Sequence, residues 1–147
     1  MKYIIKFFTV AAIAILLSAC NSKHNEPHFN YVVKGRVIDK VTQEPVKDIL
    51  VSFEQYHLPN PEDRQRTRLS PPEYDSWSDE KGNFRAFHIQ WRTPLYFYDY
   101  YGYENGFYKD TTISVDFKDV PLSGIPNGNY KGSYVLNIGD IELERIE

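Results

Sequence analysis

Apolar and polar residues alternate in short runs along most of this 147-residue chain, and turn-forming residues separate the runs. Alternation of this kind places successive side chains on opposite faces of a β-strand. In the first run, Val33, Gly35 and Val37 share one face, while Lys34 and Arg36 share the other. We therefore expect seven short strands, and the clearest runs span residues 31–39, 48–55, 83–90, 95–101, 111–117 and 134–143.

Turns and irregular segments separate these strands. Residues 79–82 read Asp-Glu-Lys-Gly, a hairpin turn in which Gly82 can adopt a positive φ. Residues 56–74 hold four prolines and a charged run, and residues 121–132 hold three glycines and two prolines, so we expect two long loops. No helical periodicity persists beyond the N-terminal segment. The pattern predicts an all-β fold, a seven-stranded antiparallel sandwich of the Ig-like or prealbumin-like kind.

The N-terminal segment has the parts of a bacterial lipoprotein signal peptide. Lys2 and Lys6 are followed by an apolar stretch at residues 7–17, and the segment ends in Leu-Ser-Ala-Cys at Cys20. A buried thiol in a transmembrane helix is the alternative, but the stretch is shorter than the roughly 20 residues that a spanning helix needs. We predict a signal peptide at residues 1–19, a lipid on Cys20, a tether at residues 20–30 and a β-sandwich domain at residues 31–147.

The net charge of the chain argues against one class of partner. Removing residues 1–19 lowers Lys+Arg from 17 to 15 and leaves Asp+Glu at 20, so the net charge changes from −3 to −5. Nucleic acid phosphates require clustered Lys and Arg, so no nucleic acid partner is expected. Cys20 is the only cysteine, and its lipid would leave the mature chain without a thiol for a disulfide, a metal site or catalysis.

Four segments in order resemble the carboxypeptidase regulatory-like domain, a transthyretin-like or prealbumin-like sandwich. They are the Val-Lys-Gly-Arg-Val-Ile-Asp strand at 33–39, the Gln-Glu-Pro-Val turn at 43–46, Asp-Glu-Lys-Gly-Asn-Phe at 79–84 and Gly-Asp-Ile-Glu-Leu at 139–143. The resemblance covers most of residues 31–143 and implies the fold, but a fold of this kind does not imply an activity.

A narrower resemblance concerns residues 104–124. Glu-Asn-Gly at 104–106, Lys-Asp-Thr at 109–111 and Leu-Ser-Gly at 122–124 look like the lipoproteins encoded beside radical SAM proteins in Bacteroidetes. That resemblance implies an outer-membrane lipoprotein, and an accessory protein or modified substrate of a radical SAM peptide-maturation system. The segment after Cys20 lacks the acidic cluster that marks surface export in such bacteria, which favours the periplasmic side over the cell surface.

A dense group of aromatic residues is the first candidate binding site. Tyr96, Tyr98 and Tyr100 alternate with Leu95, Phe97 and Tyr101, so only one of the two rows can face the core. The row with Tyr96, Tyr98 and Tyr100, together with Tyr103, could offer a face to a protein, peptide or glycan. Alternatively, the long 56–74 loop covers this row.

Candidates for catalysis or metal binding are sparse. Asp99, Glu104 and Asp110 lie in one acidic segment that could hold a cation, although a solvated turn explains the acids equally well. The four histidines have no metal-ligand spacing, and no Gly-x-Ser-x-Gly sequence occurs. We therefore expect no cofactor and no enzymatic activity, and predict a lipid-anchored envelope protein with a binding or structural role.

Overall fold

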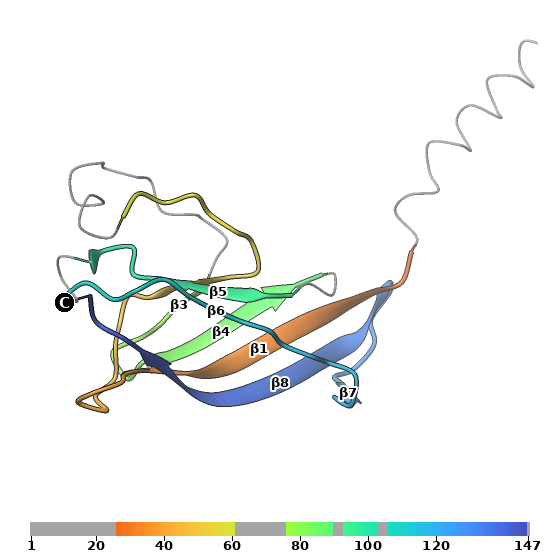
Figure 1. Cartoon of the computed structure of the whole chain (residues 1–147). Coiled ribbons are helices and arrows are strands. Elements are labelled where there is room, and N and C mark those ends of the chain that lie inside the picture. Colours follow the sequence, from red (N-terminus) through yellow and green to blue (C-terminus); the bar gives the residue numbers. More distant parts are fainter. Residues whose placement is uncertain (1–25, 61–75, 90–92, 103–105, 147) are drawn as a thin grey trace, which may run out of the picture.

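The computed structural model describes residues 26–60, 76–89, 93–102 and 106–146, and these residues form an all-β domain with two sheets (Figure 1). The predicted signal peptide, Cys20, Glu104 and Tyr103 lie outside the described residues. In the part of the chain that is described, no helix is both long and apolar enough to cross a membrane.

Each sheet contains four strands. The first sheet has the order β4-β1-β8-β7, and the second has the order β3-β2-β5-β6. The strands are β1 (His28–Asp39), β2 (Leu50–Ser52), β3 (Ser76–Trp77), β4 (Asn83–His88), β5 (Leu95–Tyr98), β6 (Thr111–Ile113), β7 (Leu122–Ser123) and β8 (Tyr130–Leu143).

The long strands β1 and β8 differ from the prediction of a wholly antiparallel sandwich. They run parallel to each other, from the His28–Tyr130 pair to the Asp39–Leu143 pair. No hairpin joins these two strands, because most of the chain lies between them, so no turn imposes an antiparallel direction. The antiparallel pairs β1–β4, β2–β5 and β5–β6 agree with the expectation.

The described residues contain eight strands, where seven were expected. β3 and β7 have two residues each, too few to show an alternating pattern, and β7 lies inside the predicted 121–132 loop. β1 and β8 begin three and four residues earlier than expected, at His28 and Tyr130. Isolated apolar patterns define strand centres better than strand ends, because pairing with a neighbour decides where a strand stops.

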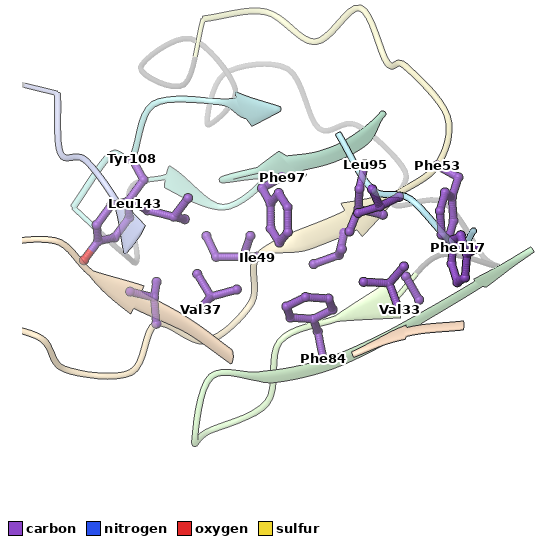
Figure 2. Close-up of a cluster of buried hydrophobic side chains, with 14 residues drawn as sticks. Val33, Val37, Ile49, Phe53, Phe84, Leu95, Phe97, Tyr108, Phe117 and Leu143 are labelled. Carbon is purple, nitrogen blue, oxygen red and sulfur yellow. The ribbon is translucent and has the colours of Figure 1, made fainter. Parts of the chain in front are cut away.

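The core lies between the two sheets, as Figure 2 shows. Val33 and Val37 of β1 are buried there, and Lys34 and Arg36 are exposed, so the predicted faces of β1 are confirmed. Phe84 and Phe97 meet edge to face, with ring centroids 5.4 Å apart, and join the two sheets at the centre. Burial of such side chains is the main favourable contribution to folding.

The predicted turn at residues 79–82 is present before β4, but it does not form a hairpin, because β3 and β4 belong to different sheets. Gly82 has a φ of +75°. Asp79 Oδ1 accepts hydrogen bonds from the backbone N–H groups of Lys81 and Asn83, both at 2.8 Å. A β-carbon on Gly82 would lie 2.3 Å from the Val37 carbonyl oxygen, so glycine is required for space as well as for backbone conformation. The turn therefore fixes where β4 begins to pair with β1.

Candidate functional site

The predicted aromatic face is largely covered. Tyr98 is only 4% exposed and Tyr100 only 6%, and both belong to a second apolar cluster on the outer face of the β3-β2-β5-β6 sheet. The Tyr98 hydroxyl accepts a hydrogen bond from the Tyr56 N–H at 2.9 Å, and Tyr56 and Leu58 pack over the cluster. Residues at the start of the 56–74 segment thus cover this row, which is the alternative expected for it.

The remaining members of the row differ in exposure. Tyr96 is partly exposed and stacks on Tyr98, with centroids 6.0 Å apart. Tyr101 was expected to share a face with Leu95 and Phe97, but it stacks on Trp77 in the second cluster. β5 ends at Tyr98, so the alternation on which that expectation rested no longer applies at Tyr101. Of the three tyrosines of the proposed binding face that the structure describes, only Tyr96 has part of its surface open.

The acidic residues proposed as a cation site differ in burial. Asp99 is buried, and its Oδ2 accepts a hydrogen bond from the Tyr108 N–H at 2.8 Å. Asp110 is exposed, and Glu104 lies outside the described residues. Among the residues that the structure places, no group of three His, Cys, Asp or Glu side chains is arranged to hold a metal ion. The hydrogen bond of Asp99 indicates that its carboxylate fixes the chain next to Tyr108.

A buried carboxylate that the sequence did not single out lies at the end of β1. Asp39 Oδ2 accepts hydrogen bonds from the Tyr108 hydroxyl and from Arg145 Nε, each at 2.6 Å. Its Oδ1 accepts from the backbone N–H groups of Val41 and Thr42. Asp39 ends the motif at 33–39 but gives no sign of its partners, which lie 69 and 106 residues away.

These bonds shift the titration of both acidic groups. The Tyr108 hydroxyl, the Thr42 N–H and Arg145 hold the pKa of Asp39 well below its usual range. Burial, followed by the hydrogen bond to Asp39, raises the pKa of Tyr108 to about 12. Both carboxylate oxygens of Asp39 accept hydrogen bonds from within the domain, so the cluster holds the end of β1 to Tyr108 and Arg145.

The outer face of the β4-β1-β8 sheet carries a hollow of about 490 Å³. It is open to solvent, since its lining residues Lys34, Arg36 and Arg85 are exposed. Its lining comes from three neighbouring strands and comprises Lys34, Gly35, Arg36, Asn83, Phe84, Arg85, Asn137, Gly139 and Asp140. We call this hollow the outer groove.

One row of the outer groove is internally neutralised. Arg36 pairs in register with Asn83 on one side and with Asp140 on the other. Arg36 Nε donates to Asp140 Oδ1 at 3.0 Å, and Arg36 Nη2 donates to Oδ2 at 2.7 Å. This two-pronged pair raises the pKa of Arg36 and lowers that of Asp140. The carboxylate of Asp140 is therefore already paired with Arg36.

The next row is not neutralised. Lys34 lies directly opposite Arg85 of β4 in the antiparallel ladder and opposite Asn137 of β8 in the parallel one. Within the described ranges, neither the Lys34 ammonium nor the Arg85 guanidinium forms an ion pair. Like charges at directly opposed positions of a sheet are unfavourable. The row therefore presents two adjacent cations to solvent in a chain whose net charge is negative.

An exposed aromatic ring extends the groove. Phe87 follows Arg85 by two residues on the same face of β4 and is 56% exposed, although its register partner Val32 is buried. Alternation predicted the outward positions of Lys34 and Arg36 but not their neighbours on β4 and β8, because pairing of distant strands is not visible in local alternation.

No protein-family model matches the chain, and the comparison with curated proteins found no match either.

Proposed function

We propose that this protein is a lipid-anchored, non-enzymatic binding module of the bacterial cell envelope, and that the outer groove binds a glycan carrying an oxyanion. The observation that carries the proposal is the opposed pair Lys34 and Arg85, two cations without an ion-pair partner in the described structure. The Leu-Ser-Ala-Cys sequence ending at Cys20 supports the anchor and the envelope location.

An oxyanion between Lys34 and Arg85 would relieve their mutual repulsion and accept hydrogen bonds from both. Charge-assisted hydrogen bonds of this kind are roughly twice as strong as those between neutral groups. Arg85 offers a planar fork that suits a carboxylate, sulfate or phosphate, and Lys34 adds a compact positive charge. The groove thus offers an anion two neighbouring positive charges, although the net charge of the chain is negative.

The neighbouring side chains favour a saccharide as the carrier of that anion. Asn83 and Asn137 flank the cations, where Asn83 Nδ2 donates to Asp79 Oδ2 and Asn137 Oδ1 accepts from the Gly139 N–H. Asn83 Oδ1 can still accept a hydrogen bond from a sugar hydroxyl, and Asn137 Nδ2 can still donate one. Phe87 offers an exposed ring next to Arg85 against which a sugar ring can pack. A hollow of about 490 Å³ is in the range of small-ligand sites.

A saccharide array tests this proposal with matched probes. We would compare saccharides bearing a uronic acid, a sulfate or a phosphate with their neutral counterparts, using the wild-type protein and Lys34→Ala/Arg85→Ala. We expect acidic saccharides to bind, binding to weaken with salt, and the double variant to lose at least about tenfold in affinity.

The matched control is Lys81→Ala/Lys118→Ala, which removes the same charge from two exposed lysines outside the groove. This control should bind as the wild type does. Equal binding of neutral saccharides, or an equal loss in both double variants, would contradict a specific site at Lys34 and Arg85.

A further inference from the structure

Most of the exposed large apolar side chains gather at one end of the domain. In the described part of the chain these are Phe87, Ile89, Leu122 and Ile125 at one end, and Val41 at the other. Ile89 follows His88, the partner of Tyr31, and Leu122 pairs with Tyr134, which also pairs with Tyr31. Ile125 lies between β7 and Tyr130, the partner of His28.

This end is also where the chain enters the domain. Figure 1 shows the start of β1 at the same end of the domain as β7 and the start of β8, and beyond the end of β4. Phe87 lies on the outer face of the sheet, next to the groove. Ile89 follows the last residue of β4, Leu122 lies in the edge strand β7, and Ile125 follows β7. We call these three residues the apolar rim.

The length of chain before β1 limits how far the apolar rim can be from a lipid anchor. Seven residues lie between Cys20 and His28, so eight residue steps join the two. At about 3.6 Å per residue, they span at most about 29 Å even when fully extended. A lipid on Cys20 would therefore hold the apolar rim close to the bilayer, where a weak contact becomes effective because the local concentration is high.

We propose that the apolar rim contacts the lipid surface and that the domain therefore stands with β1 and β8 upright on the membrane. The inference rests on the proposed lipid anchor. Ile125 is 87% exposed, and a side chain of this size gains free energy when it leaves water for the interfacial region of a bilayer.

The orientation has a consequence for the outer groove. Ile89 and Leu122 lie near the level of Tyr31 of β1 and Ile125 lies near the level of His28, so Lys34 is three to six residues further along the strand. A strand rises about 3.3 Å per residue, so the groove would be about 10–20 Å above the rim. At that height, and on a face parallel to the strands, the groove stays open to a partner while the rim is covered by lipid.

The experiment uses the full lipidated protein in phosphatidylcholine vesicles with a single fluorescent label. A lipid on Cys20 consumes the only natural thiol, so an introduced cysteine is labelled alone. Asn127→Cys carries an environment-sensitive fluorophore near the apolar rim and leaves Leu122 and Ile125 intact. Val41→Cys is the control, because Val41 is 84% exposed and lies at the opposite end. Vesicle flotation is measured first, and nitroxide-labelled lipids then serve as quenchers.

We expect a blue-shifted emission at position 127 and at least twofold stronger quenching there than at position 41. Adding Leu122→Ser/Ile125→Ser should abolish most of that difference, which excludes insertion driven by the label itself. Equal quenching at both positions in a protein that floats with vesicles would overturn the inference while leaving the anchor intact. A blue shift without lipid quenching would indicate a second copy at the rim and would also contradict it. Failure to float would instead reject the anchor and, with it, the proposed contact.

Discussion

The Tyr108 hydroxyl donates a 2.6 Å hydrogen bond to Asp39 Oδ2 and so joins the end of β1 to a segment 69 residues further along the chain. Arg145 donates to the same oxygen and lies over the Tyr108 ring, with its guanidinium carbon 5.3 Å from the ring centroid. Three distant parts of the sequence thus meet at one carboxylate, which is only 1% exposed.

Replacing that carboxylate should destabilise the domain. Asp39→Asn keeps the shape but turns one acceptor into an N–H donor that faces other donors, so buried groups lose their partner. We expect the free energy of unfolding in urea to fall by about 2–3 kcal/mol. Asp140→Asn, which removes the exposed partner of Arg36, serves as the control and should change stability little.

The same cluster predicts loss of stability at high pH. The pKa of Tyr108 is raised to about 12 in the folded state, against about 10 in an unfolded chain. The folded state therefore binds this proton more tightly, and its contribution is full below about pH 10 and is lost as the pH rises towards 12. Urea unfolding from pH 9 to 12 should show the stability gap between wild type and Tyr108→Phe narrowing. A gap that stays constant over this range would contradict the assignment.

Asp39 predicts a loss of stability at low pH, whereas Tyr108 predicts one at high pH. Its folded-state pKa lies well below its ordinary value, so the contribution of this carboxylate is full above about pH 4 and declines as the pH falls further. We expect Asp39→Asn to lose less stability than the wild type between pH 5 and pH 2 in urea unfolding. Parallel curves for the two proteins would show that Asp39 does not carry this dependence.

The close approach of β1 and β8 leaves no room for a side chain at Gly35. A β-carbon there would lie 2.6 Å from the Gly139 carbonyl oxygen, and the register shifts between Lys34 and Arg36 at this point. Backbone must move to admit it, so Gly35→Ala should cost about 2 kcal/mol in thermal or urea unfolding. Gly128→Ala is the comparison, because nothing lies within 4 Å of its added carbon, although its φ of +57° adds mild strain. Equal losses at the two glycines would argue against close contact of β1 and β8.

Local alternation predicted the rows of side chains but not their neighbours. The inward direction of Val33 and Val37 and the turn at Gly82 follow from residues within one or two strands, and the structure confirms them. The parallel pairing of β1 with β8 brings residues about a hundred positions apart together, and no local pattern encodes it. The opposed cations Lys34 and Arg85 depend on strand pairing in the same way, because their alignment follows from the register of β1 and β4.

The tyrosine row shows a second limit. Alternation correctly placed Leu95 and Phe97 on one face and Tyr96 and Tyr98 on the other, and the structure shows that Leu95 and Phe97 face the core. It could not decide whether that other face is open, because the covering residues Tyr56 and Leu58 come from a segment without alternation. Burial on the outer face depends on where an irregular segment lies, and that is a tertiary property.

The hydrogen bond between Tyr98 and the covering segment can be tested by substitution. Tyr98→Phe deletes the acceptor of the Tyr56 N–H and creates no cavity. We expect a loss of about 1 kcal/mol in urea unfolding and faster amide hydrogen exchange at Tyr56. Tyr96→Phe, on the partly exposed neighbour, should leave the exchange at Tyr56 unchanged. Unaltered exchange in Tyr98→Phe would show that apolar packing alone holds the segment.

Attachment of the domain to a membrane through Cys20 is tested most directly by the intact mass of the native protein from bacterial membranes. We predict a chain that begins at Cys20, is heavier by a diacylglycerol and enters the detergent phase on phase separation, whereas Cys20→Ser keeps the mass of the uncleaved chain. A native protein without added lipid that stays in the aqueous phase would contradict the anchor.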